Sequence, residues 1–210
     1  MFEMQVDLPQ NLENMKLPSP ELLSYYQDAS NRIVWIEGEV DESLLFIVRD
    51  ILRWNREDEG VPAENRKPIS ILIFSPGGCL YSALALIDAI EMSKTPVFTV
   101  NMGQAYSAGL CILMAGHKRS TLPKASAMLH KGSAVIGGTA AQVDSGAQHY
   151  KSQLNMLKEY TLSKTTVDGR MYNRKKDEDW YLDAAEMLKY GFVDSVVSDI
   201  DEILSKGGVG

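Results

Sequence analysis

The chain has few of the residues on which several common classes of function depend. It contains only two cysteines, Cys79 and Cys111, in 210 residues, too few for a disulfide framework and without the spacing of a metal site. Positive charge is in the minority, with 21 Lys and Arg against 28 Asp and Glu. This balance argues against a nucleic-acid partner, because phosphate binding needs clustered cations.

Long apolar runs are also missing. No segment approaches the roughly 20 apolar residues that span a bilayer, and the first residues have neither the basic nor the apolar region of a signal peptide. We therefore expect no membrane partner and a cytoplasmic location. Hydrophobic residues make up 45% of the chain and charged residues 23%, which is ordinary for one globular domain with a sizeable core.

What is present is a regular alternation of strand and helix patterns. Residues 1–31 show little periodicity, so we expect an irregular arm with a short helix at 21–28. Beyond the arm, the patterns predict strands at 32–36, 69–74, 96–100, 119–122 and 127–129, and helices at 44–54, 82–93, 110–115, 139–163 and 183–190. The alternation predicts an α/β fold with right-handed crossovers. The strand at 69–74 is apolar apart from Ser70, which is typical of a strand covered on both faces.

A candidate nucleophile lies in the segment GQAYSAG, residues 103–109, which we expect to form a turn between a strand and an apolar helix. Small residues on both sides of Ser107 permit a tight turn that presents the hydroxyl at the positive end of the helix. Ala105 stands where the hydrolase elbow pattern has its first glycine. A turn with a helix-capping serine is therefore the alternative interpretation.

A nucleophilic serine needs a base, and the chain has three histidines. His149 falls in the middle of a polar helix, where simple exposure explains it, and His117 follows Gly116 at a helix end, where we expect a C-capping role. His130 instead ends the apolar strand 127–129, and strand ends are where α/β folds display functional groups. From the residues alone, a structural role for His130 remains the alternative.

Four ordered motifs resemble the proteolytic subunits of the Clp protease family, and the similarity extends from about residue 32 to 197. The motifs are SPGG at 75–78, GQA at 103–105 with Ser107 and Gly109, LP at 122–123 with MLH at 128–130, and DWYLDAAEMLKYGFVDS at 179–195. The resemblance implies Ser107 as nucleophile, His130 as general base and Asp179 as the carboxylate that orients the imidazole. Spacing alone does not choose Asp179 over Asp177 or Asp183; the match to the family makes that choice.

Further site residues follow from the same resemblance. It implies that the backbone N–H groups of Gly78 and Ala108 form an oxyanion hole, in which one donor is typically worth about 3 kcal/mol. It places Gly77 beside the substrate and implies that Ser133-Ala134-Val135 pairs as a strand with the substrate main chain, which gives broad sequence specificity. No cofactor and no metal are expected.

The resemblance also sets the expected architecture and partners. It implies a ClpP/crotonase-like superhelix of repeated β-β-α units, with an arm at 1–31, a peptidase domain at 32–200, a handle at about 132–165 and a tail at 201–210. The implied activity is that of a serine endopeptidase that cleaves peptides or unfolded proteins inside a chamber. The chamber would be a homo-oligomer, a heptameric ring that is single or stacked in pairs, and an AAA+ unfoldase is the candidate partner.

Two departures concern these partners. Where the family has an acidic–Arg pair that links rings, this chain has Asp177-Glu178, so Lys175 or Lys176 is the candidate substitute. Where the family's groove for its ATPase is lined by aromatic residues, this chain has Ser70, Leu72 and Met92.

A third departure lies beside the proposed base. Lys131 follows His130 at a position that is commonly Gln in the family. A protonated Lys near the imidazole would disfavour a positive charge on it, unless the side chain points away.

Three alternative functions fit the same fold. A viral-type head-maturation or scaffold-processing peptidase is favoured by the altered groove. An acyl-CoA enzyme of the crotonase class uses backbone oxyanion holes but does not require the Ser-His-Asp set. A catalytically silent ring subunit would form rings without hydrolysing peptides.

Overall fold

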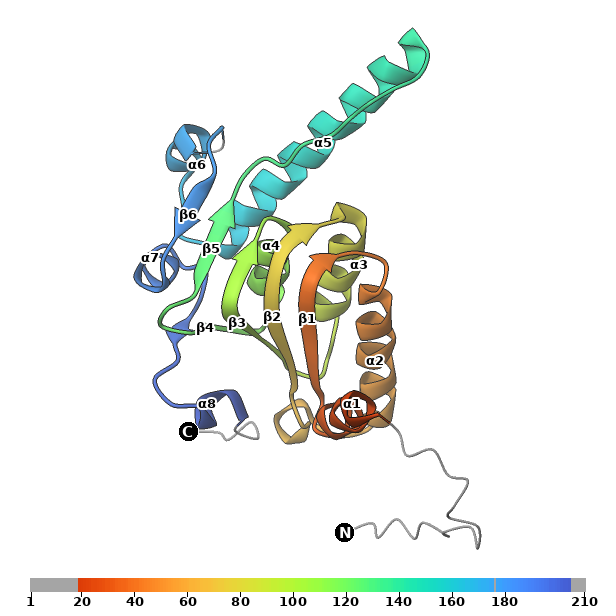
Figure 1. The fold of residues 1–210 in the computed structure, drawn as a ribbon, viewed down its shortest axis with the longest axis vertical. Helices are drawn as coiled ribbons and strands as arrows, with labels where there is room; N and C mark the ends of the chain where they lie inside the picture. The colour runs from red at the N-terminus through yellow and green to blue at the C-terminus, as the bar shows by residue number, and fades with distance from the viewer. Residues whose placement is uncertain (1–18, 176, 205–210) are drawn as a thin grey trace, which may run out of the picture. The chain divides into compact units, whose positions relative to one another are not determined.

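The computed structural model describes residues 19–175 and 177–204, and the chain divides into two compact units, residues 1–31 and 32–210 (Figure 1). The helices are α1 (Pro20–Ser30), α2 (Leu44–Glu57), α3 (Leu80–Glu91), α4 (Ala108–Ala115), α5 (Ala140–Lys164), α6 (Gly169–Lys175), α7 (Ala184–Lys189) and α8 (Asp201–Leu204), with a 3-10 turn at Ala63–Asn65. The strands are β1 (Ile33–Val40), β2 (Ile69–Gly78), β3 (Val97–Tyr106), β4 (Lys118–Thr121), β5 (Ser126–Leu129), β6 (Trp180–Leu182) and β7 (Ser195–Val196).

The described part of the first unit is the helix α1. The hydroxyl of Ser19 accepts a hydrogen bond from the backbone N–H of Leu22, and Pro20 occupies the first helical position, so the start of the helix is capped. The helix predicted at 21–28 is therefore present and slightly longer. The irregular segment expected at 1–18 and the tail at 205–210 lie outside the described residues, and α8 occupies the beginning of the expected tail.

The second unit is built on a sheet that is mainly parallel, which confirms the α/β prediction. The strand order is β1-β2-β3-β4-β7, while β5 pairs in parallel with β3 and antiparallel with β6. Three strands are longer than predicted, since β1 runs through Gly38, β2 through Gly78 and β3 through Gly103 to Tyr106. The pairings of β1 with β2 and of β2 with β3 contain register shifts. A bulge of this kind lets a strand continue past a glycine that the sequence pattern had marked as the end of the strand. The turn predicted at 103–109 is therefore wrong.

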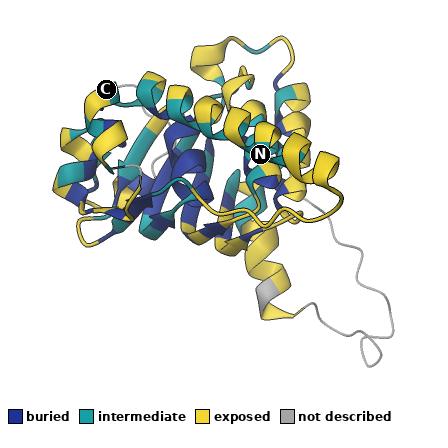
Figure 2. Ribbon diagram, turned by 90° about the horizontal axis from the view of Figure 1, so that it is seen from above, coloured by how far each residue is buried: buried dark blue, intermediate teal, exposed yellow. Residues whose placement is uncertain are grey.

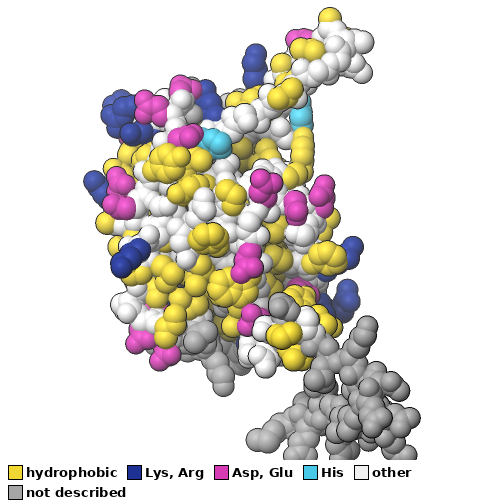
Figure 3. Space-filling view, viewed as in Figure 1, with side chains coloured by type: hydrophobic (Ala, Val, Ile, Leu, Met, Phe, Trp, Pro, Cys, Tyr) yellow, Lys and Arg dark blue, Asp and Glu magenta, His cyan; other side chains and the backbone are white. Residues whose placement is uncertain are grey.

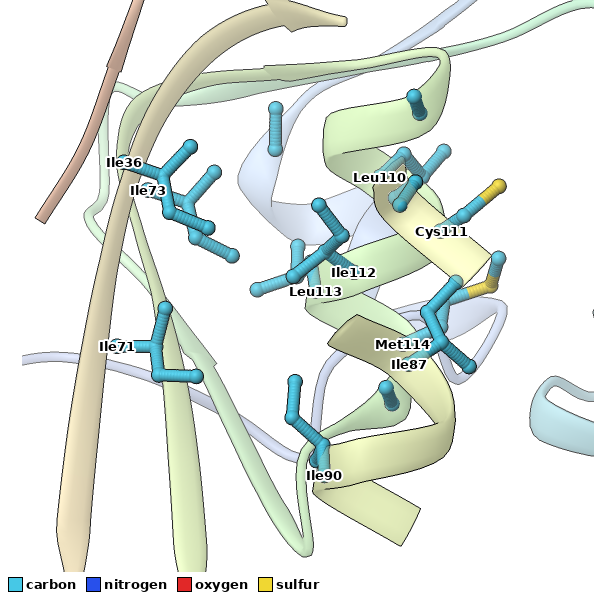
Figure 4. Close-up of a cluster of buried hydrophobic side chains, with 14 of the residues drawn as sticks. Ile36, Ile71, Ile73, Ile87, Ile90, Leu110, Cys111, Ile112, Leu113 and Met114 are labelled. Carbon is cyan, nitrogen blue, oxygen red and sulfur yellow. The ribbon is translucent and has the colours of Figure 1, made fainter. Parts of the chain in front are cut away.

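The main core lies between one face of this sheet and the helices α3 and α4. Ile71 and Ile73 of β2 point toward Ile112 and Leu113 of α4 (Figure 4), and the buried residues form a continuous band through the second unit (Figure 2). All eight residues of α4 are buried, which is typical of a helix that is apolar all round. The large apolar side chains among them, Leu110, Ile112, Leu113 and Met114, each contribute about 1.5–3 kcal/mol of stability, so the helix that follows Ser107 is held firmly.

The opposite face of the sheet is only partly covered. Leu72 is buried under a small cluster with Val100, Val197 and Ile203, but Phe74 is 49% and Trp35 is 42% exposed. Hydrophobic side chains are accordingly spread over the surface seen in Figure 3. The prediction that the strand 69–74 is covered on both faces is thus wrong for this face, because an apolar run does not reveal whether its second face is covered.

The long helix α5 is anchored at its C-terminal end, while its N-terminal half projects from the second unit (Figure 1). The guanidinium of Arg119 donates to the carbonyls of Lys164 (2.8 Å) and Gly191 (3.0 Å) and pairs with Asp194. The hydroxyl of Tyr160 donates to the carbonyl of Cys111 in α4 at 3.1 Å. These contacts fix the half of α5 that lies next to α4.

His117 joins the end of α4 to the start of β3. The imidazole Nδ1 of His117 accepts a hydrogen bond from the backbone N–H of Val97 at 2.9 Å, and the backbone N–H of His117 donates to the carbonyl of Val97 at 2.8 Å. The predicted C-capping role is wrong, because Gly116 is the C-cap of α4. Burial, together with the nearby Lys164 ammonium, lowers the pKa of the His117 imidazole below its usual value of about 6.5.

This shift predicts a loss of stability in mild acid. The unfolded chain binds a proton on His117 more readily than the folded chain does, so the free energy of unfolding falls as the pH drops below about 6.5. His117→Asn keeps an acceptor for the Val97 N–H but does not titrate. We expect its urea midpoint to fall less than that of the wild type between pH 7.5 and 5.5, at one fixed protein concentration.

The exposed His149 provides the control. His149→Asn should retain the acid sensitivity of the wild type. An equal fall of the midpoint in His117→Asn and the wild type would contradict the assignment.

Candidate active site

Ser107 is the single residue between β3, which ends at Tyr106, and α4, which begins at Ala108. Its backbone has φ 52° and ψ −117°, a region that non-glycine residues rarely adopt and that is costly unless the surroundings impose it. Its N–H donates to the carbonyl of Met128 at 2.8 Å, which ties the turn to β5. The side chain makes no capping hydrogen bond to α4, so the helix-capping alternative does not hold.

Gly77 makes room for this turn. A Cβ atom at Gly77 would lie 2.7 Å from the Cβ of Ser107 and 2.8 Å from the carbonyl oxygen of Tyr106. Gly77 also has φ 96°, in the region that favours glycine. The SPGG motif is therefore required in part because Ser107 occupies the space of a side chain at Gly77.

The register between β3 and β5 brings His130 to Ser107. Tyr106 is the partner of Met128 in this parallel pairing, so the residues that follow each strand emerge side by side at the same edge of the sheet. The Nε2 atom of His130 lies 2.7 Å from the Oγ atom of Ser107, which is a hydrogen bond.

The register between β5 and β6 brings Asp179 to His130. Leu129 is the partner of Trp180 in this antiparallel pairing, so the next opposed pair is His130 and Asp179. The Oδ1 atom of Asp179 lies 3.5 Å from Nδ1 of His130, longer than a good hydrogen bond, and the aspartate side chain is 54% exposed.

The other two candidate carboxylates have different partners. Asp177 forms an ion pair with Lys131, and Asp183 caps α7 by accepting the N–H of Glu186 at 2.8 Å. Of the three aspartates that spacing left open, Asp179 is the one beside the imidazole.

Gly78 and Ala108, the expected oxyanion donors, both line the cavity that holds Ser107 and His130. Ala108 is the first residue of α4, where a backbone N–H has no acceptor within the helix. Gly78 has φ 148°, and a Cβ there would lie 2.4 Å from the carbonyl oxygen of Val40 in β1. Any side chain at this position would push β2 away from its neighbour.

The cavity has a volume of about 460 Å³, which is in the range of ligand pockets. One wall comes from α5 and α6, and sequence analysis singled out none of the six lining residues on these helices, which are Tyr150, Gln153, Leu154, Leu157, Thr161 and Tyr172. Four of these six residues recur at spacings of four, three and four along α5, a helical stripe that could have revealed a buried face. The apolar wall includes Cys111, and burial raises the pKa of its thiol to about 12, so the thiol stays neutral.

The segment Ser133-Ala134-Val135 leaves the site as an irregular, exposed stretch, with Val135 fully exposed. Within the described part of the chain, its peptide groups have no hydrogen-bond partner. Gly77, the other expected substrate-binding residue, lies against Ser107 itself. The expected peptide-binding residues thus border the same site from two sides.

His149 is exposed, as expected, but it also has a specific partner. Its Nε2 lies 2.8 Å from the hydroxyl oxygen of Tyr81 at the start of α3. Together with the hydrogen bond from the Tyr150 hydroxyl to the carbonyl of Gly132 (3.1 Å), this contact ties the middle of α5 to segments that border the cavity.

Among residues 19–175 and 177–204, no group of His, Cys, Asp or Glu side chains is arranged to hold a metal ion. None of the described helices is long and apolar enough to cross a membrane.

The sequence is similar to those of known proteins of one family. The family model described as Clp protease matches residues 22–199. ATP-dependent Clp protease proteolytic subunit 1 of Frankia casuarinae is 33% identical over 183 residues, which cover 86% of this chain and 83% of the relative. Subunit 2 of Nocardia farcinica is 33% identical over 180 residues (84% and 86% covered), and subunit 1 of Streptomyces avermitilis is 33% identical over 177 residues (83% and 79% covered).

These matches identify the chain as a hydrolase of the serine-peptidase class. The chain belongs to the Clp protease family, and the resemblance inferred from its four motifs is confirmed.

The crowding at Gly78 leads to a prediction. Gly78→Ala should lower kcat/KM at least about a hundredfold, because one misplaced oxyanion donor typically costs about 3 kcal/mol. Hydrolysis of a short fluorogenic peptide measures the rate, and circular dichroism monitors the fold.

The matched control is Gly38→Ala, at a glycine with φ 81° and nothing within 4 Å of the added Cβ. It introduces similar backbone strain away from the site and should retain activity. Wild-type turnover in folded Gly78→Ala would exclude this residue as a donor.

Proposed function

We propose that this chain is a serine endopeptidase that cleaves peptide bonds through an acyl-enzyme formed by Ser107, His130 and Asp179. The observation that carries the proposal is the imidazole of His130, which lies 2.7 Å from the serine hydroxyl and 3.5 Å from the aspartate. A hydroxyl, an imidazole and a carboxylate in this order form the catalytic triad of serine peptidases.

The reaction follows from this arrangement. The Oγ atom of Ser107 attacks the scissile carbonyl carbon while its proton passes to Nε2 of His130, and the N–H groups of Gly78 and Ala108 donate to the resulting oxyanion. The imidazolium then gives its proton to the leaving amine, the C–N bond breaks, and an ester with Ser107 remains. Water, deprotonated by His130, attacks this ester and restores the serine. Asp179 stays ionised throughout and fixes the ring so that Nε2 faces the hydroxyl.

Substrate binding is proposed to use the main chain of the substrate. The unpaired peptide groups of Ser133-Ala134-Val135 would add a substrate strand, with Gly77 on the other side of the cleaved bond. The cavity beside Ser107, with its partly apolar wall from α5, would take one substrate side chain. Main-chain recognition with a single pocket gives broad specificity, which suits unfolded proteins and peptides.

We also propose that the chain acts in a homo-oligomeric chamber, a heptameric ring that is single or stacked in pairs, with α5 as the handle. Thr161 is the one buried residue of α5 within the described chain, while Val143 and Met156 are exposed, as are Phe46 and Leu52 on α2. Exposed apolar surface of this extent favours burial between subunits. The expected cytoplasmic location and an AAA+ unfoldase partner belong to the same proposal, supported by relatives that are named as ATP-dependent.

A processing peptidase on the same scaffold is the second candidate. The observation in its favour is that Leu72, at one of the expected groove positions, is buried under Val197 and Ile203. Ser70 and Met92 likewise offer no aromatic surface. Degradation of a stable folded substrate only when an AAA+ unfoldase and ATP are added would decide against this candidate.

Removal of the nucleophile tests the activity. Ser107→Ala should reduce hydrolysis of a short fluorogenic peptide to below about a thousandth of the wild-type rate, the usual loss for such a group. A fluorophosphonate probe should label the wild type stoichiometrically at Ser107 and leave the variant unlabelled. Light scattering should give both proteins the same mass, and higher residual turnover would exclude Ser107 as the nucleophile.

The choice of carboxylate has a separate test. Asp179→Asn should lower kcat by a factor on the order of 10³ to 10⁴, because an amide stabilises the wrong imidazole tautomer. Asp177→Asn, two residues away, should lower kcat far less. If kinetics on the same peptide reverse this order, Asp177 rather than Asp179 orients the imidazole.

A further inference from the structure

The segment that carries Asp179 is weakly held. The ladder between β5 and β6 contains three residue pairs, and the last is Leu129 with Trp180. Asp179 lies just beyond it, outside β6, and within the described chain its carboxylate contacts the imidazole of His130. An aspartate side chain that is 54% exposed and 3.5 Å from its partner needs another restraint to stay opposite the ring.

An ion pair joins the same two segments just beyond His130 and Asp179. The ammonium group of Lys131, the residue after His130, contacts Oδ1 of Asp177, two residues before Asp179. The proposed His130–Asp179 pair therefore lies between two other contacts, the strand pair Leu129–Trp180 on one side and the ion pair Lys131–Asp177 on the other. Both contacts connect the end of β5 and the residues after it with the segment that leads into β6.

We propose that Lys131 and Asp177 are positioning residues, whose ion pair holds Asp179 opposite His130. The inference deepens the proposed function and rests on it. The pair ties the turn before β6 to the end of β5, so that the aspartate cannot swing into solvent. It also offsets the charge of an ammonium next to the base in sequence, which would otherwise oppose the imidazolium formed during the reaction.

Loss of the Lys131–Asp177 ion pair should lower kcat without lowering the thermal midpoint. The side chains of Lys131 and Asp177 are 36% and 62% exposed, and exposed ion pairs contribute little to folding. A small displacement of Asp179, however, acts directly on the orientation of the base.

Asp177→Asn is the primary variant, because Lys131 also lines the cavity. We expect kcat on a fluorogenic peptide to fall about two- to fivefold, the range that corresponds to the coupling in exposed ion pairs, with KM and the thermal midpoint unchanged. Glu178→Gln is the matched control, since it removes one negative charge from the same turn without touching the pair, and it should retain wild-type kcat.

Two further measurements separate positioning from a general effect. Sodium chloride at 1 M weakens exposed ion pairs, so it should lower kcat of the wild type toward that of Asp177→Asn while leaving the variant nearly unchanged. The charge-swapped double variant Lys131→Glu with Asp177→Lys should recover more kcat than either single variant.

The decisive experiment is a double-mutant cycle on the rate of fluorophosphonate labelling at Ser107. If Asp177 acts through Asp179, Asp177→Asn should slow labelling of the wild type about two- to fivefold and have no effect in the Asp179→Asn background. An equal slowing in both backgrounds, or the same slowing by Glu178→Gln, overturns the positioning role. Failure of the proposed function looks different, since the wild type would then not be labelled at Ser107 at all.

Discussion

The site depends on two strand registers that meet at β5. One register is parallel and places His130 beside Ser107, and the other is antiparallel and places Asp179 across from His130. A slip of one residue in either register would reverse which face each side chain points to and would separate the three groups. The buried helix α4 and the glycine at position 77 then fix the backbone of Ser107 in a conformation that it would not adopt by itself.

The site has a rigid side and a weakly held side. Ser107 lies between a central strand and a fully buried helix, so its position is determined by the core. Asp179 and the segment Ser133-Ala134-Val135 lie at the surface, outside regular structure, and α5 is anchored mainly at its C-terminal end. Placement of the proposed nucleophile is therefore a property of the fold, whereas placement of the proposed carboxylate and of a substrate would depend on a few polar contacts.

Much of the fold was predictable from the sequence, because the periodic apolar segments that predict β1–β5, α2–α5 and α7 are also the segments that pack. The errors arose where local chemistry was ambiguous. Gly38 and Gly103 resemble strand ends in the sequence but lie at irregularities within strands, and α6, a short polar helix, has no apolar periodicity. For the site, the turn chemistry indicated Ser107 and the strand end indicated His130, but the choice among three aspartates needed the family resemblance. The stripe that contains Tyr150 and Leu154 indicates a buried face of α5, but which segments this face meets depends on tertiary packing, which no local pattern encodes.

The order of the segments along the chain has a consequence for biosynthesis. All of α5 and α6 lies between His130 and Asp179, and β6 pairs with β5 only after both helices have been translated. A chain still on the ribosome can bring serine and imidazole together, but it lacks the carboxylate until almost the whole second unit has emerged. The proposed peptidase would therefore be made in a form that is poorly active toward neighbouring nascent proteins.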